Sequence, residues 1–160
     1  MFGFGRPKNS TDFRPFMRRI ADLTVPNLST AAASDRAENR YNRTLPVLVC
    51  PWENGRPLTG QVMRGVTKDI ADYGVGIVLT TPIVAHDDVV VAFCLDGLNE
   101  EPWFFLGAIR RNDAIGGGFW LIGVEWVEYM NGNRLREVEV LMDVAQKLLP
   151  SSASLVDALS

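Results

Sequence analysis

The sequence predicts a mainly β protein, in which a six-stranded antiparallel barrel follows one short helix and precedes another. Six short β-rich runs lie between residues 47 and 129, separated by turn residues such as Glu53-Asn54-Gly55 and Gly116-Gly117-Gly118. In the run 119–129, apolar residues at every second position alternate with a set that includes a glycine and a glutamate, which is typical of a sheet with one buried face. Because short turns join neighbouring strands antiparallel and closure removes exposed edges, we expect a closed or nearly closed barrel.

The composition agrees with one soluble globular domain. The chain has 160 residues, of which 47% are hydrophobic and 22% are charged, and a domain of this size removes about 70% of its unfolded surface from water. The longest apolar runs, 89–95 and 119–124, are much shorter than the roughly 20 residues that cross a bilayer. No apolar stretch typical of a secretory signal follows Arg6 and Lys8, so we expect a cytoplasmic protein without membrane insertion.

The first predicted element is a short helix over residues 10–23. Its apolar side chains recur at helical spacing, at Phe13, Phe16, Met17 and Ile20. Pro26 ends the helix, and residues 27–39 are small and polar, which predicts a linker or a docked loop. Residues 1–35 are therefore expected to form an N-terminal helix and linker.

The six strands are followed by a second helix. We expect the strands at residues 47–52, 58–66, 76–81, 89–95, 103–111 and 119–129. Apolar residues then recur in steps of three and four, which predicts a helix with a stripe formed by Leu135, Val138, Met142, Ala145 and Leu149. This stripe is expected to close one end of the barrel or to pack on its outside; a dimer seam is the alternative, so we expect a monomer or a weak dimer. The barrel domain spans 36–150, and 151–160 form a flexible tail.

The sequence offers little for catalysis. Cys50 and Cys94 stand alone in apolar runs and are expected to be buried packing residues. His86, the single histidine, lies in a polar turn without an obvious nucleophile nearby. Because no phosphate loop, metal cluster or nucleophile elbow occurs, we expect no enzyme, no metal and no cofactor. An enzyme on a flavin-binding split barrel remains a third alternative, although it needs a phosphate cradle that the sequence does not show.

Positive charge is concentrated in the first part of the chain. The net charge is −3, but residues 6–43 carry eight basic and four acidic residues, whereas 44–160 carry eight and fifteen. A local excess of +4 predicts an anion site near the N-terminal region, because a surface for a nucleic acid polymer is usually basic across a whole face. Arg36, Arg40 and Arg43 lie in this region, directly before the first strand.

A second group of residues, Asp69, Ala71 and Gly74, lies in the connection expected between the second and third strands. With these residues and the arginines before the first strand, the chain resembles the PilZ family, bacterial domains that bind the second messenger cyclic di-GMP on a six-stranded barrel. The family has Arg-x-x-x-Arg before the first strand, and this sequence has Arg36 and Arg40. The family has Asp-x-Ser-x-x-Gly after the second strand, and this sequence has Asp69, Ala71 and Gly74 at the three positions. Ala71 stands where the family has Ser, so one hydroxyl donor is missing.

Two later motifs extend the resemblance to about residues 36–149. Gly107-Ala-Ile-Arg110-Arg111 is similar to the family's Gly-x-x-x-Arg, and Gly123-Val-Glu-Trp126 is similar to its final Gly-x-x-Phe. Short motifs of this kind are near chance on their own, so their order and strand placement carry the resemblance. A second arginine register is also open, in which Arg43 is the second arginine of the motif and Asn39 occupies the first position.

The resemblance implies a role for each matched residue. Arg36, Arg40 or Arg43 would grip phosphate oxygens or the O6/N7 edge of guanine, or stack on a base. Asp69 would accept hydrogen bonds from guanine N1–H and its amino group, while Gly74 would allow an unusual turn conformation. The structural alternatives are a simple turn around Asp69 and a solvated charge cluster for the arginines.

The sequence therefore predicts a non-enzymatic signalling receptor in which the segment 36–43 closes over cyclic di-GMP. This closure is expected to change what the domain presents to an unknown protein effector. The alternative is a degenerate PilZ domain that does not bind the nucleotide and acts as a protein–protein adaptor in motility, pilus or exopolysaccharide control. Asn39 and Ala71 favour that alternative.

Overall fold

The computed structural model describes residues 13–24, 40–41, 44–95 and 101–148. In chain order its elements are α1 (Arg14–Thr24), β1 (Arg40–Tyr41), β2 (Pro46–Glu53), β3 (Arg56–Pro57), the 3-10 turn η4 (Thr59–Gln61), β4 (Met63–Ala71), β5 (Gly74–Leu79), β6 (Asp88–Phe93), β7 (Trp103–Gly116), β8 (Phe119–Tyr129) and α3 (Leu135–Leu148). The two described α-helices have 11 and 14 residues, and neither is long and apolar enough to cross a bilayer.

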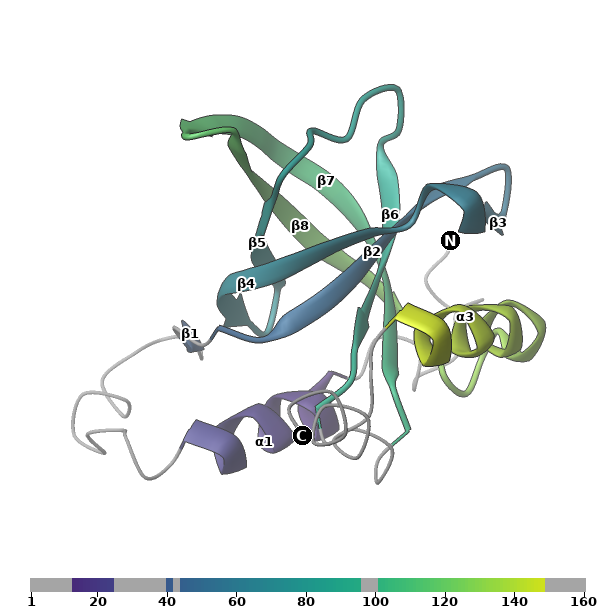
Figure 1. The fold of residues 1–160 in the computed structure, drawn as a ribbon. Coiled ribbons are helices and arrows are strands. Elements are labelled where there is room, and N and C mark those ends of the chain that lie inside the picture. The colour runs from purple at the N-terminus through teal and green to yellow at the C-terminus, as the bar shows by residue number, and fades with distance from the viewer. Residues whose placement is uncertain (1–12, 25–39, 42–43, 96–100, 149–160) are drawn as a thin grey trace, which may run out of the picture.

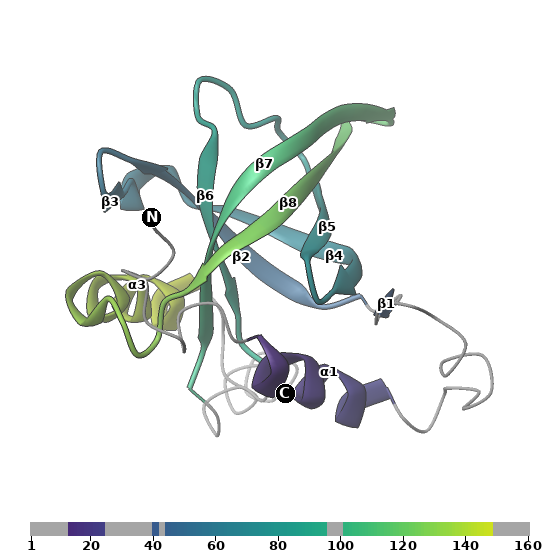
Figure 2. The same ribbon diagram turned by 180° about the vertical axis from the view of Figure 1, so that it is seen from behind.

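Six of the strands close into a barrel, as Figures 1 and 2 show from opposite sides. Each strand pairs antiparallel with the next in the order β2, β4, β5, β8, β7, β6, and β6 pairs again with β2. This confirms the predicted mainly β fold, a six-stranded antiparallel barrel with an N-terminal and a C-terminal helix. Two short strands extend the sheet, since β1 pairs with the end of β4 and β3 with the end of β2.

Alternate residues of the strands fill the barrel interior. In β8, Ile122, Val124 and Trp126 face inward and are at most 7% exposed, as the alternating pattern predicts. In β2, by contrast, six consecutive residues are buried. Their second face is buried because α3 covers the outside of the barrel there.

Helix α1 closes one end of the barrel. Phe16, Met17 and Ile20 are at most 6% exposed and belong to the interior cluster. The ring centroid of Phe16 lies 4.6 Å from that of Phe105 in β7. Figure 1 shows α1 across the lower end of the barrel, at the end opposite the β7–β8 hairpin. The predicted N-terminal helix is therefore part of the folded barrel.

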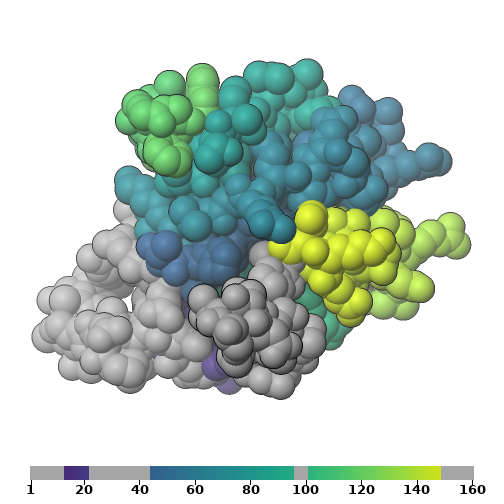
Figure 3. Space-filling view, viewed as in Figure 1, coloured from purple at the N-terminus to yellow at the C-terminus, as the bar shows by residue number. Residues whose placement is uncertain are grey.

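Helix α3 packs on the outside of β2, β6 and β7, and Figure 3 shows it in yellow on the surface of the molecule. Val138, Leu141 and Ala145 are buried against residues of these strands, which confirms that the helix packs on the barrel. The predicted stripe was partly wrong, because Leu135 is 74% exposed and Leu141 takes the central position. Leu149, the last residue of that stripe, lies outside the described residues. Leu135 is the first residue of the helix, where the sheet no longer covers the stripe.

The two cysteines differ in burial. Cys50 lies beneath α3 and is 2% exposed, so it is a buried packing residue as predicted. Burial raises the pKa of its thiol from 9.0 to about 11, which keeps the thiol protonated near neutral pH. Cys94 is only half-buried, and neither cysteine forms a disulfide bond.

The predicted position of the second barrel strand was wrong. A strand was expected over 58–66, but a 3-10 turn comes first and β4 runs through Lys68 and Asp69, which were expected in a connection. A register shift between Thr67 and Asp69 adds one residue to β4 at this point. Thr67 and Ile70 are consequently both buried, three positions apart, while the two charged residues between them lie outside.

The packing of α1 can be tested with Phe16→Ala. We expect the free energy of unfolding to fall by about 3–5 kcal/mol, because the substitution leaves a cavity at the end of the barrel. Urea unfolding followed by tryptophan fluorescence measures the loss, since the ring centroids of Trp103 and Trp126 lie 5.4 and 6.4 Å from that of Phe16. Arg18→Ala, at an exposed position of the same helix, should change the value by less than about 0.5 kcal/mol. Equally small losses in both variants would contradict a structural role for α1.

Candidate functional site

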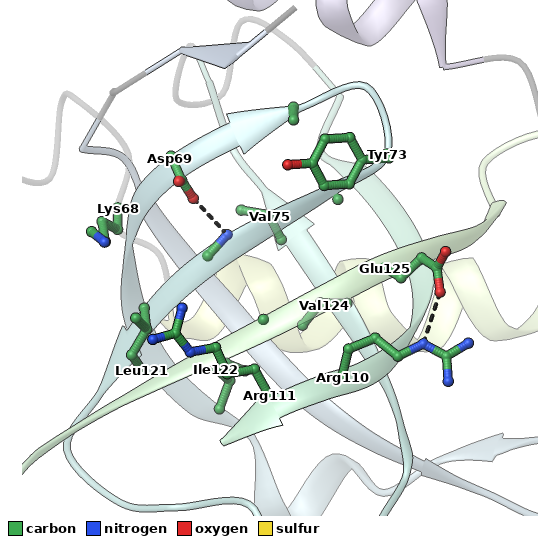
Figure 4. Close-up of a pocket in the computed structure, with 14 residues that line it drawn as sticks. Lys68, Asp69, Tyr73, Val75, Arg110, Arg111, Leu121, Ile122, Val124 and Glu125 are labelled. Atoms are coloured by element: carbon green, nitrogen blue, oxygen red, sulfur yellow. Dashed lines mark hydrogen bonds and ion pairs between the residues drawn. The ribbon is translucent and has the colours of Figure 1, made fainter. Parts of the chain in front are cut away.

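A groove with a volume of about 400 Å³ lies on the outer face of β4, β5, β8 and β7 (Figure 4). This volume is within the roughly 300–1,000 Å³ that is usual for small-molecule pockets. Three of the residues predicted for the site line it: Asp69, Ala71 and Gly74. The groove also contains charged and aromatic side chains for which no ligand role was predicted, namely Lys68, Tyr73, Arg110, Arg111 and Glu125.

The carboxylate of Asp69 is fixed at one edge of the groove. The backbone N–H of Gly76 on β5 donates a hydrogen bond to Asp69 Oδ1 at 3.2 Å, drawn as a dashed line in Figure 4. A carboxylate has two oxygens and about four acceptor positions, so this bond leaves capacity for a ligand donor. The carboxylate therefore shapes the β4–β5 pair and can also accept hydrogen bonds from the groove.

Gly74 is required by a close approach between strands. The backbone of Gly74 does not have a positive φ, which corrects the prediction that this residue supplies an unusual turn conformation. A Cβ atom at this position would lie 2.2 Å from the carbonyl oxygen of Val124 on β8. Glycine thus lets β5 start two residues earlier than predicted, directly against β8.

The arginine segment reaches the same end of β4. In the backbone pairing of β1 with β4, Arg40 lies opposite Ala71 and Tyr41 lies opposite Ile70. The chain positions of Arg40, Asp69, Ala71 and Gly74 are therefore close together. Arg36 and Arg43, with Asn39 of the second register, lie outside the described residues.

Ala71 occupies a confined position in this cluster. It is 4% exposed, and its carbonyl oxygen accepts a hydrogen bond from Trp126 Nε1 at 3.1 Å. The backbone N–H of Trp126 also donates to the carbonyl oxygen of Tyr73, at 2.9 Å. Both bonds fix the turn between β4 and β5, where the two strands meet the groove.

Two neighbouring arginines of β7 form the opposite side of the groove. Arg110 Nε donates to Glu125 Oε1 at 2.7 Å, and Arg111 Nε donates to Asp113 Oδ2. In Figure 4 the two side chains diverge, with the guanidinium group of Arg111 beside Leu121 and that of Arg110 beside Glu125. The sequence did contain a signal for them, the Gly-x-x-x-Arg motif. The position of Arg111 on the groove face of the sheet was missed, because β7 was expected to end at residue 111. The strand continues to 116, with a register shift between 109 and 111.

The close approach at Gly74 can be tested with Gly74→Ala. The added methyl group would meet backbone atoms that cannot rotate away, so we expect a loss of at least about 1–3 kcal/mol in unfolding free energy. Gly60→Ala is the matched control, because a Cβ atom there meets nothing within 4 Å. Thermal unfolding of both variants measures the difference. If Gly74→Ala is as stable as Gly60→Ala, then β5 and β8 do not approach each other this closely at Gly74.

No protein-family model matches this chain, and no curated protein matches it. Among solved structures, it is similar to the inhibitor of motility MotI/DgrA of Bacillus subtilis, with 15% identity and a TM-score of 0.45 over 72% of this chain and 53% of that one. It is also similar to the PilZ domain of YcgR from Escherichia coli, solved with c-di-GMP, with 14% identity and a TM-score of 0.38 over 69% of this chain and 88% of that one. The chain thus spans about half the length of the first of these structures.

Proposed function

We propose that this chain is a non-enzymatic receptor domain of the PilZ type, which binds cyclic di-GMP in the groove between β4 and β7. The observation that carries this proposal is the pairing of β1 with β4. It sets Arg40 opposite Ala71, two residues from Asp69. An arginine segment and a carboxylate at the edge of one groove are the chemistry that a guanine nucleotide needs, because guanidinium groups bind phosphate and carboxylates bind the donor edge of guanine.

In this proposal the arginines and the aspartate bind different parts of the ligand. Arg40, with Arg36 or Arg43 according to the register, neutralises the phosphates and stacks on a base. Asp69 accepts hydrogen bonds from guanine N1–H and its amino group. The groove is electrically mixed, since Lys68 and the two arginines of β7 share it with Asp69 and Glu125. The additional arginines of the segment would therefore supply most of the net attraction for a doubly negative ligand.

Ligand binding would act as a signal by fixing the arginine segment. That segment follows α1 in the chain, and α1 is packed in the end of the barrel. The nucleotide must bind the closed arrangement more tightly than the open one, because equal affinity for both would shift no population. Closure would then alter the surface formed by the segment and α1, which an effector could recognise.

Ala71 supports the second candidate, a PilZ-type adaptor that no longer binds the nucleotide. The missing hydroxyl group removes one hydrogen bond, worth about 0.5–1.5 kcal/mol or roughly three- to tenfold in affinity. The adaptor also has apolar surface for a protein partner, since Ile115 and Phe119 beside the β7–β8 turn are 50% and 47% exposed. The two candidates differ in one measurable property, which is nucleotide affinity.

Calorimetric titration with cyclic di-GMP tests the proposal through Asp69. Asp69→Asn keeps an oxygen that can accept from Gly76 N–H but loses the negative charge that guanine N1–H and the amino group would meet. We expect about tenfold to hundredfold weaker binding, because hydrogen bonds to charged groups contribute about 1.5–3 kcal/mol. Asp143→Asn, on the exposed face of α3, removes the same charge outside the groove and should leave affinity unchanged.

Ala71→Ser restores the missing hydroxyl group. The same titration should show a three- to tenfold rise in affinity for cyclic di-GMP if this group reaches the ligand. Arg36→Ala and Arg43→Ala separate the two arginine registers, with Arg18→Ala as a control outside the segment. Absence of heat and of a thermal shift with about 100 μM cyclic di-GMP, a concentration well above a micromolar dissociation constant, would favour the adaptor instead.

A further inference from the structure

Four residues form a continuous row across the floor of the groove. Asp69 on β4 pairs with Gly76 on β5, Gly76 pairs with Gly123 on β8, and Gly123 pairs with Arg111 on β7. Direct cross-strand partners lie on the same face of a sheet. The row therefore places an acidic side chain and a guanidinium group at opposite edges of the groove, with two glycines between them.

The two glycines leave room for the two charged side chains. A Cβ atom on Gly76 would lie 2.6 Å from Asp69 Oδ1, and one on Gly123 would lie 3.1 Å from Arg111 Cβ. Any larger residue would displace these side chains. Glycine at both positions therefore lets the carboxylate of Asp69 and the stem of Arg111 lie close to the sheet and line one groove.

The two charged side chains stand on strands that are three steps apart. Neighbouring strands are about 4.8 Å apart, so the backbones of β4 and β7 are separated by about 14 Å. Both side chains line the same groove, so a ligand in it can meet the carboxylate and the guanidinium group together.

The chemistry of the two edges selects among purines. Asp69 can only accept hydrogen bonds, and the guanidinium of Arg111 can only donate them. Guanine has donors at N1 and its amino group and acceptors at O6 and N7, which match an acceptor on one side and a donor fork on the other. Adenine has a donor amino group in place of O6, so it would place a donor against the arginine.

We propose that Arg111 is a second base-reading residue, which binds the O6/N7 edge of the guanine whose donor edge faces Asp69. This assignment rests on the proposed function and gives the groove its preference for guanine over adenine. The hydrogen bond from Arg111 Nε to Asp113 of the same strand uses the inner nitrogen of the fork, and the stem of the side chain passes Gly123 on β8. In Figure 4 the guanidinium group of Arg111 lies at the same end of the groove as Asp69, on the opposite edge, whereas that of Arg110 turns toward Glu125.

Arg110 is the matched control, because it is the neighbouring arginine, lines the same groove and carries the same charge. With cyclic di-GMP, Arg111→Ala should weaken binding by about tenfold or more, as for other bidentate contacts to guanine. Arg110→Ala should weaken it less than Arg111→Ala, because the guanidinium group of Arg110 is paired with Glu125 and turns away from Asp69. Arg111→Lys keeps the charge but loses the fork, so it should behave like Arg111→Ala.

Two ligand analogues separate the two edges of the base. The 7-deaza analogue of cyclic di-GMP lacks the N7 acceptor, so the effect of Arg111→Ala should shrink with it while the effect of Asp69→Asn persists. Cyclic di-inosine monophosphate lacks the amino group, so the reverse should hold. Equal losses for Arg110→Ala and Arg111→Ala with every ligand would overturn the assignment and leave cyclic di-GMP binding intact.

Gly123→Ala tests the placement of Arg111 without changing a charge. The methyl group would lie 3.1 Å from Arg111 Cβ and displace this side chain, so we expect weaker binding, whereas Gly60→Ala outside the groove should bind normally. Thermal unfolding of each variant establishes that it is folded before titration. If the unaltered chain binds none of the three cyclic dinucleotides, the proposed function and this assignment both fail. If it binds them and Gly123→Ala has no effect, the assignment of Arg111 fails while the proposed function stands.

Discussion

The hydrogen bonds of Trp126 to the β4–β5 turn hold the structure together at the point where the groove begins. Its backbone N–H donates to Tyr73 and its indole N–H to Ala71, so a single residue of β8 binds both sides of the turn. The strand β5 lies between β8 and β4, so the indole reaches across it through the barrel interior. Because the indole is 7% exposed, no bulk water competes strongly for these bonds.

The same indole connects the groove with α1. Its ring centroid lies 6.1 Å from that of Phe13 and 6.4 Å from that of Phe16, and it packs against Phe105 at 4.7 Å. A shift of the Ala71 carbonyl would therefore change the position of a ring against which the N-terminal helix packs. Packed aromatic clusters have few alternative arrangements, so a small movement of one ring forces the neighbouring rings to repack.

The barrel could be predicted from the sequence because alternation is a local signal. The run 119–129 has apolar residues at every second position from 120 to 126 and was placed at its observed bounds. Lys68 and Asp69 were placed outside a strand because two adjacent charged residues break the alternation, and their polarity is typical of a turn. The missing information was the bulge, which depends on the pairing with β5 and has no signal within β4 itself. The charged residues of the groove were found only in part for the same reason.

Bulges also explain why charged residues lie at both edges of the groove. In a regular strand, one of two neighbouring side chains must point into the barrel, and a charged group there would be strongly destabilising. The register shifts in β4 and β7 fall at Lys68-Asp69 and at Arg110-Arg111. In each pair both side chains remain outside, so each edge strand of the groove contributes two charged groups where a regular strand would contribute one. The interior therefore stays apolar on either side of these pairs, while the groove carries both acidic and basic side chains.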